Sequence, residues 1–167
     1  MTNYDIIGDI HGQAGKLEGL LAILGYEPAG AGYRPPKGRK AIFLGDLIDR
    51  GPGQLRVLEI VRTMVEDGNA LCIMGNHELN AIGFVSRSDS ADHDFYRPNS
   101  AKNHKQHAEF LAQVGEGELD AGQGVAQFVG QPCGHFPHRR QTVRLRQAAA
   151  TGHGLFVVAR MLHYLHA

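Results

Sequence analysis

The sequence is short of cysteine, of net charge and of long apolar runs, and each shortage excludes a class of protein. Its two cysteines, Cys72 and Cys133, form no CxxC pair and no framework of several bridges, which favours a reduced, intracellular protein. Lys plus Arg equals Asp plus Glu at 17 each, so no overall field attracts nucleic acid or an anionic membrane, and we expect neither as a partner. No apolar run approaches the roughly 20 residues that cross a bilayer, and the first residues lack the basic region of a signal peptide. We therefore expect a cytoplasmic protein.

The balanced charge hides a difference between the two ends of the chain. Residues 1–120 hold 12 basic and 17 acidic side chains, whereas residues 121–167 hold five Arg and no Asp, Glu or Lys. We predict a partial core over residues 1–115 and an atypical tail over residues 116–167 that is poorly ordered. A truncation or an altered reading frame near residues 115–120 would explain the change in composition.

The first 85 residues repeat one pattern three times, a short apolar run that stops at a Gly followed by Asp or Asn. The runs are Tyr4–Ile7, Ala41–Leu44 and Ala70–Met74. Helical stripes follow the first two, at Leu17, Leu20, Leu21 and Leu24 and at Leu55, Leu58, Val61 and Val65. The alternation predicts an α/β fold of parallel βα units, with strands buried on both faces.

Two intervening segments look irregular. Residues 28–38 are rich in Gly and Pro and are predicted to be a loop, and residues 86–103 are polar and are predicted to be a mobile loop or lid. A further helix is expected from about Ala101 to Val114, with Phe110 on its apolar side.

Polar side chains follow each predicted strand directly. Asp9, Asp46 and Asn76 all come after a strand and a Gly, and His11 lies two residues beyond Asp9. Ligands of open α/β sheets bind beyond the carboxyl ends of the strands. Carboxylate and imidazole side chains suit a divalent metal such as Mn, Fe or Zn, so the three strand ends predict a metal site.

Neighbouring residues add phosphate-type chemistry. Arg50 offers a planar fork that matches two phosphate oxygens, and His77 titrates near neutral pH and suits a general acid with Asp49 as the partner that orients it. Asn76 offers an amide oxygen to a metal and an NH2 group to phosphate. Alone, each motif also fits an ordinary turn, a surface Asp–Arg pair or a helix cap, but their occurrence together favours an active site.

The strings GDIHG, GDLIDRGP and GNHE resemble the first three signature motifs of the calcineurin-like metallophosphoesterases. The second and third are similar to the branch that holds bacterial serine/threonine phosphatases and symmetrical diadenosine tetraphosphate hydrolases. The resemblance covers residues 4–85 and extends weakly to residue 115. It implies that this chain forms the front half of an αββα sandwich.

The resemblance also implies roles. Asp9 and His11 would ligate one metal, Asp46 would bridge two metals, and Asn76 would ligate the second metal and touch phosphate. His77, oriented by Asp49, would protonate the leaving oxygen while Arg50 clamps the phosphate, and a metal-bound hydroxide would attack phosphorus. Mn is the metal expected to support activity in vitro.

The family completes its second metal site with two further histidines, and their identity stays open. Gly-His pairs occur at His135 and His153, but neither follows an apolar strand-like run. The second metal site is therefore expected to be incomplete. The leading hypothesis is a metal-dependent phosphoesterase acting on a phosphoprotein or a small phosphate ester, with a serine/threonine protein phosphatase and a dinucleotide polyphosphate hydrolase as alternatives. The rival hypothesis is a remnant that binds metal or phosphate without turnover.

Overall fold

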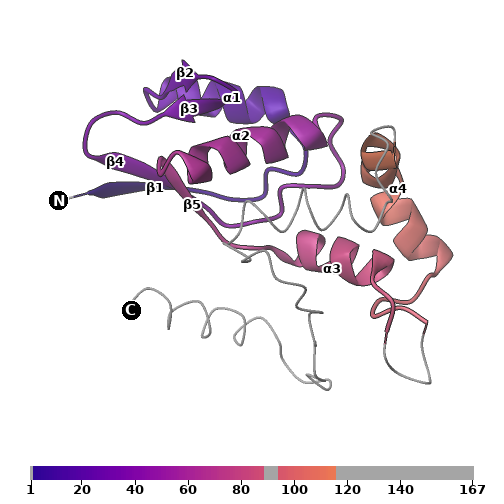
Figure 1. Ribbon diagram of the computed structural model, residues 1–167. Helices are drawn as coiled ribbons and strands as arrows, with labels where there is room; N and C mark the ends of the chain where they lie inside the picture. The colour runs from indigo at the N-terminus through magenta and orange to yellow at the C-terminus, as the bar shows by residue number, and fades with distance from the viewer. Residues whose placement is uncertain (1, 89–93, 116–167) are drawn as a thin grey trace, which may run out of the picture. The chain divides into compact units, whose positions relative to one another are not determined.

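A computed structural model describes residues 2–88 and 94–115 of the chain. The sequence forms a three-stranded parallel sheet in the order β1 (Asn3–Ile7), β4 (Arg39–Phe43) and β5 (Ala70–Cys72). Helices α1 (Ala14–Ile23) and α2 (Gln54–Glu66) lie in the connections between these strands, as the alternating pattern predicts (Figure 1). The mixed α/β architecture with a parallel sheet is thus confirmed.

The remaining elements follow the sheet in sequence. Helix α3 (Asn76–Val85) begins directly after the β5 edge, and α4 (Ala101–Gly115) agrees with the helix predicted over residues 101–114. An isolated antiparallel bridge pairs Arg87 with Phe95 between these two helices. Among the described residues, no helix is long and apolar enough to cross a membrane. The predicted tail over residues 116–167 lies outside the described residues.

The segment predicted to be a loop contains a small hairpin instead. Strands β2 (Glu27–Ala29) and β3 (Gly32–Arg34) pair antiparallel, and β3 packs on α2 with Gly32 close to Thr63 and Met64. Gly- and Pro-rich turns are equally the signal of a tight hairpin, and strands this short show no alternation of apolar and polar residues. The loop prediction was therefore wrong for the residues that pair.

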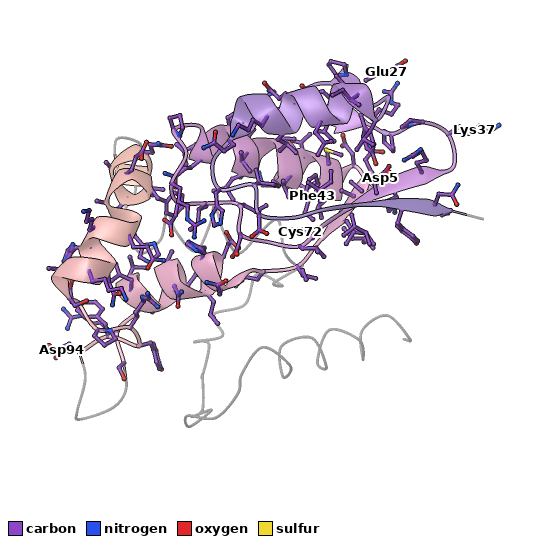
Figure 2. The ribbon with its side chains drawn as sticks, turned by 180° about the vertical axis from the view of Figure 1, so that it is seen from behind. Asp5, Glu27, Lys37, Phe43, Cys72 and Asp94 are labelled. Carbon is purple, nitrogen blue, oxygen red and sulfur yellow. The ribbon has the colours of Figure 1, made fainter. Side chains whose placement is uncertain are left out.

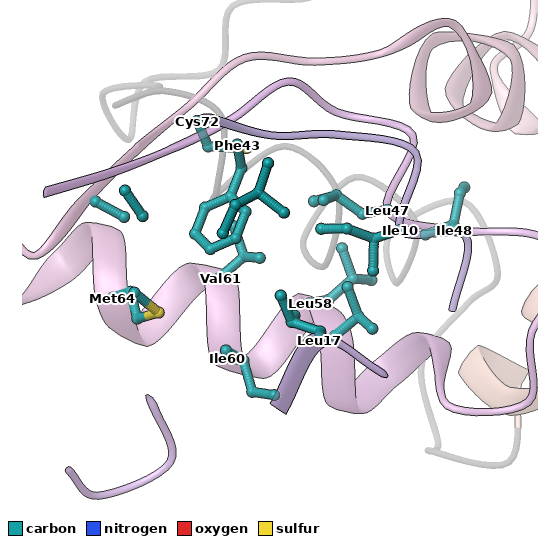
Figure 3. Packing of buried hydrophobic residues seen from close by; sticks show 14 of the residues in the cluster. Ile10, Leu17, Phe43, Leu47, Ile48, Leu58, Ile60, Val61, Met64 and Cys72 are labelled. Atoms are coloured by element: carbon teal, nitrogen blue, oxygen red, sulfur yellow. The ribbon is translucent and has the colours of Figure 1, made fainter. Parts of the chain in front are cut away.

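The core lies between the sheet and the two helices, and α2 contributes most of its helical side. Phe43 from the central strand β4 and Cys72 from β5 meet the buried face of α2, as Figure 3 shows at close range. The same two residues lie within the fold in Figure 2, whereas Glu27, Lys37 and Asp94 belong to its exposed surface. The buried residues of α2 are Gln54, Val57, Leu58, Ile60, Val61 and Met64.

Among the described residues, helices cover only one face of the sheet in this way, so the prediction of strands buried on both faces was wrong for this part of the chain. Ile6, Ile42 and Leu71 are paired across the three strands, and they point away from α1 and α2 because side chains alternate along a strand. Ile6 is 68% exposed and Leu71 is 40% exposed. Their apolar character had been interpreted as a sign of two-sided burial, but it marks an apolar face that is open to solvent.

The register of the sheet aligns the strand ends. Ile7 pairs with Phe43, and Phe43 pairs with Cys72, so the three strands finish level with one another. The segments that follow, which start at Gly8, Leu44 and Ile73, therefore leave the sheet at one edge. This edge carries the polar residues that the sequence singles out.

Candidate metal and phosphate site

Strained backbone marks the site. Within the described part of the chain, five residues other than Gly have a positive φ, and all five lie in the first two motifs: Asp9, His11, Asp46, Asp49 and Arg50. Their φ angles run from 45° to 71°, in the left-handed region that L residues seldom adopt. Such strain persists only where surrounding contacts fix it and is typical of functional sites.

Backbone hydrogen bonds hold the two strained loops against each other. The His11 N–H donates to the Asp46 carbonyl at 2.8 Å, and the Gly12 N–H donates to the Leu47 carbonyl at 2.7 Å. The Gly53 N–H donates back to the Gly12 carbonyl at 2.9 Å. The first two motifs thus form one rigid platform.

The third motif approaches the second so closely that only Gly fits. A Cβ at Gly45, where φ is +80°, would overlap the backbone of Gly75, and a Cβ at Gly75 would overlap the backbone and carboxylate of Asp46. This close approach explains why Gly precedes both Asp46 and Asn76. The repeated Gly that the sequence shows at each strand end is therefore, in these two cases, a packing requirement.

A buried Glu fastens the two motifs together. The Glu78 carboxylate is fully buried and accepts hydrogen bonds from the N–H groups of Asp46 at 2.8 Å, Leu47 at 2.7 Å and Ile48 at 3.2 Å. It also accepts one from the Gly75 N–H at 2.8 Å. The sequence analysis assigned this residue no role in the site. A Glu three residues after a helix N-cap is nevertheless the signal of a capping box, in which its carboxylate accepts from the N-cap backbone N–H.

Three side chains from the three motifs converge into a possible metal cluster. Ligand atoms of His11, Asp46 and His77 all lie within 4.8 Å of one another. The His11 Nδ1 lies 3.0 Å from the Ile48 carbonyl oxygen, and it must be the donor because a carbonyl can only accept. In the neutral ring, the His11 Nε2 therefore has the lone pair that a metal needs. The Asp9 carboxylate lies nearby, with Oδ1 3.9 Å from His11 Nε2, and its side chain is 86% exposed.

The donor set fits a divalent metal. Imidazole nitrogens and carboxylate oxygens suit Mn, Fe or Zn, and each of the two rings is oriented by a hydrogen bond at Nδ1, as metal-binding histidines usually are. His77, predicted to be a general acid, belongs to this cluster. Of the other predicted ligands, Asp9 lies next to His11 at the side of the cluster, and Asn76 lines the adjoining pocket. The assignment of individual ligands therefore stays a prediction.

Asp49 and His77 form the second functional pair. The His77 Nδ1 lies 2.6 Å from Asp49 Oδ2, and the Asp49 side chain is 1% exposed. The other Asp49 oxygen accepts a hydrogen bond from His107 Nδ1 at 3.0 Å, and Gln106 Nε2 donates to Oδ2 at 3.3 Å. Burial raises the pKa of Asp49, but the hydrogen bonds from His107 and His77 outweigh it, so the pKa lies below its ordinary value.

An open pocket adjoins this pair and has room for a substrate. Its volume is about 470 Å³. Arg50 and Asn76, both predicted to bind phosphate, lie in its wall, and α4 supplies residues that sequence reasoning missed. The lining residues are Asp49, Arg50, Asn76, His77, Asn80, Lys105, Gln106 and Glu109.

The residues from α4 could not be assigned to the site from local motifs. The helix itself is predicted correctly, but which of its side chains faces the site depends on how α4 docks near α2. A usable signal was the spacing of His107, which stands at i to Phe110 at i+3 and Val114 at i+7 and so shares the apolar stripe of the predicted helix.

Comparisons with known proteins agree with the site. A family model described as calcineurin-like phosphoesterase matches residues 3–145, a range that passes the predicted boundary at residue 115. The chain is 46% identical over 74 residues to the asymmetrical bis(5'-nucleosyl)-tetraphosphatase PrpE of Halalkalibacterium halodurans, covering 44% of this chain and 30% of the relative. The proteins of the same name from Oceanobacillus iheyensis and a Geobacillus species are 42% and 47% identical over 73 residues, covering 44% of this chain and 29% and 30% of those relatives.

The match spans less than a third of each relative's length. These relatives are named as asymmetrical hydrolases, whereas the second and third motifs resemble the branch that holds the symmetrical ones.

Proposed function

Because the chain belongs to the calcineurin-like phosphoesterase family, we propose that it hydrolyses phosphate esters with the help of divalent metal ions. The single observation that carries this proposal is the meeting of His11, Asp46 and His77, one from each motif, within 4.8 Å at one edge of the sheet. A buried Asp behind His77 and a pocket beside it, whose wall includes Arg50 and Lys105 as well as Glu109, complete an arrangement suited to phosphoryl chemistry.

We assign the roles as follows. Asp9, His11, Asp46 and Asn76 hold up to two metal ions, of which Mn is the one for first trials. When bound, such ions acidify water and neutralise charge on the attacking and leaving oxygens. The exposed Arg50 guanidinium binds two phosphate oxygens in the pocket that it lines.

His77 donates the proton that the leaving oxygen needs. Its Nδ1 is held by Asp49, and Nε2 is the ring nitrogen left to face a substrate. The backbone N–H of the same residue donates to Asp46 Oδ1 at 3.1 Å, which holds the Asp46 carboxylate against the start of α3. Asp49 acts through His77 and is a positioning residue.

The decisive test measures bound metal and hydrolysis of p-nitrophenyl phosphate on the same purified chain. We expect Mn to stimulate hydrolysis and Asp46→Asn to abolish both the stimulation and most of the metal binding. Asp67→Asn is the matched control, because Asp67 is an exposed residue after α2, and it should behave as the wild type.

The rival proposal, a remnant that binds without turnover, predicts a different combination. It predicts Mn uptake that Asp46→Asn weakens, with no hydrolysis above the rate of the Asp46→Asn variant. A chain that neither takes up Mn nor hydrolyses the ester would refute both proposals.

For the substrate class, we favour a dinucleoside polyphosphate over a phosphoprotein. The relatives are named as nucleosyl-tetraphosphatases, and the pocket wall presents a second cation, Lys105, in addition to Arg50. A chain of several phosphates offers charge to both cations, whereas a phosphomonoester offers one group.

The second cation makes the substrate class testable. Lys105→Ala should reduce kcat/KM for diadenosine tetraphosphate about tenfold, as expected for the loss of one charged contact of about 1.4 kcal/mol. It should leave p-nitrophenyl phosphate hydrolysis near the wild-type rate. Lys102→Ala on the same helix is the control, because Lys102 is exposed and does not line the pocket. Preferential hydrolysis of a phosphoserine peptide would favour the serine/threonine protein phosphatase instead.

A further inference from the structure

A buried imidazole from α4 contacts the Asp49 carboxylate on the side away from His77. His107 is 0% exposed, and its Nδ1 lies 3.0 Å from Asp49 Oδ1. Since His77 occupies Oδ2, both carboxylate oxygens have an imidazole partner. Asp49 is thus held from two opposite sides by residues that are far apart in sequence.

Packing alone does not explain a histidine at this position. The His107 Nε2 is buried and has no hydrogen-bond partner among residues 2–88 and 94–115, which costs free energy that an apolar side chain would not cost. The His107 ring also lies 5.7 Å from the Phe84 ring, a contact that Leu or Phe could replace. Within the described part of the chain, the polar contact that accounts for the imidazole is the hydrogen bond to Asp49.

The contact fixes which ring nitrogen of His107 is the donor. Because an ionised carboxylate can only accept, Nδ1 carries the hydrogen that Asp49 Oδ1 accepts. His107 therefore donates a hydrogen bond to Asp49, and its Nε2 makes none with the described residues. It serves as a fixed donor, and a proton relay through its far side has no group to pass a proton to among the described residues.

His107 contacts the one carboxylate oxygen of Asp49 that His77 and Gln106 do not contact. The Asp49 backbone is in the left-handed region with φ of 66°, and its N–H is held by Gln54 Oε1 at 2.8 Å. These contacts fix the backbone, whereas His77 and Gln106 hold the carboxylate at Oδ2. A donor on each oxygen sets the plane of the carboxylate and hence the direction of His77, as outer partners of active-site groups do elsewhere.

We propose that His107 is a positioning residue of the phosphoesterase site, fixing the Asp49 carboxylate in the orientation that aims His77 at the pocket. Gln106, the preceding residue of α4, adds a weaker donor to Oδ2, and its own Oε1 accepts from Arg97 at 3.1 Å. Through these two side chains, helix α4 helps to set the orientation of the Asp49 carboxylate. The catalytic consequence of this inference rests on the proposed function, whereas the geometric consequence does not.

The first arm of the test needs no turnover. In protein labelled with ¹⁵N at histidine, the Nδ1–H protons of His77 and His107 should both give downfield NMR signals, and Asp49→Asn should move both. His107→Leu should remove one signal and shift the other. His107→Asn, whose NH2 group occupies the place of Nδ1, should leave the His77 signal near its wild-type position.

The control for this arm is His104→Leu. His104 lies on the exposed side of the same helix and its ring also packs on Phe84, at 4.9 Å, but it does not contact Asp49. Its replacement should leave both signals unchanged. A His77 signal that is identical in wild type and His107→Leu would overturn the proposal, whether or not the chain has activity.

The second arm measures hydrolysis of p-nitrophenyl phosphate with Mn. His107→Leu should lower kcat about tenfold or more with little change in KM, the size usual for the loss of an outer partner. His107→Asn should recover most of the loss, and in an Asp49→Asn background His107→Leu should have no further effect. Equal losses in His107→Leu and His107→Asn, or a full additional loss in the Asp49→Asn background, would show a merely structural role. A wild-type chain without turnover would refute the proposed function, and the NMR arm would still decide the positioning role.

Discussion

The rings of His11 and His77 meet edge to face, with their centroids 4.6 Å apart and their planes at 76°. Each ring is held at Nδ1 by the second motif, His11 by the Ile48 carbonyl and His77 by Asp49. Both rings are therefore oriented before any ligand arrives. A site prepared in this way loses little conformational entropy when it binds a metal.

Metal binding should consequently stabilise the folded chain. We expect the Tm to rise with Mn concentration, since a ligand at 100 times its Kd adds about 2.7 kcal/mol to the free energy of unfolding. His11→Ala should remove most of this rise, because it deletes one of the side chains that we assign to metal binding. His104→Ala, which changes an exposed histidine, should keep it. Thermal melts followed by circular dichroism provide the measurement, and an equal rise in all three proteins would place the metal elsewhere.

Replacing the buried Glu78 should destabilise the fold. In Glu78→Gln, an NH2 group would face backbone N–H donors that now find a carboxylate. The expected loss is about 3 kcal/mol of unfolding free energy, from weakened charge-assisted hydrogen bonds and an unsatisfied buried donor. Urea denaturation would measure it. Glu66→Gln, at the exposed end of α2, should change stability by less than about 0.5 kcal/mol, and similar losses in the two variants would contradict our account of Glu78.

Alanine substitutions at two glycines should distinguish the cost of steric overlap from the cost of a left-handed backbone. Both Gly45 and Gly68 have a positive φ, +80° and +71°, but only Gly45 has backbone atoms in the space that a Cβ would fill. Gly68→Ala should cost about 1 kcal/mol, the strain of a left-handed Ala. Gly45→Ala should cost about 3 kcal/mol, because overlap with Gly75 is added. Equal midpoints in urea for the two variants would refute this close approach.

Acid should weaken the chain partly through Asp5. Hydrogen bonds from Arg39 lower the pKa of Asp5, burial opposes this effect, and the Tyr26 hydroxyl lowers the pKa further. Because the folded pKa lies below the unfolded value of roughly 3.9, the ionised carboxylate adds stability above that pH. This contribution is lost as the pH falls through the lower, folded value.

The measurement is the free energy of unfolding from pH 7 down to pH 2. Asp5→Asn should be less stable than the wild type at neutral pH, and the difference should shrink below about pH 4. Asp67→Asn, which changes an exposed residue, is the control. A difference that stays constant over the whole range would show that the Asp5 contribution is not ionic.

Much of the fold follows from local sequence patterns. The alternation of apolar runs with the stripes at Leu17 and Leu58 was enough to predict parallel βα units, because a helix face has a fixed period and a short continuous apolar run between turns is typical of a strand. The strand ends at Asp9 and Asp46 could be placed at one edge because parallel strands share a direction. The hairpin over residues 27–34 was missed because its strands are too short to show any period.

The site was only partly accessible from sequence. The contact of Asp49 with His77 lies within the recognised motifs, whereas His107 and Lys105 reach the site through the packing of a distant helix, which no local pattern records. The open face at Ile6 and Leu71 was misinterpreted for a related reason. An apolar strand looks the same in sequence whether or not another layer covers it.

The carboxylate of Glu78 links backbone groups on both sides of the site, and this has a consequence for local opening. The amides of Asp46, Leu47, Ile48 and Gly75 share one acceptor side chain. None of them can be freed to water by a small movement of its own loop unless that side chain gives way. Their deuterium uptake should therefore proceed at a common rate set by a single opening event, so that the second and third motifs behave as one cooperative unit.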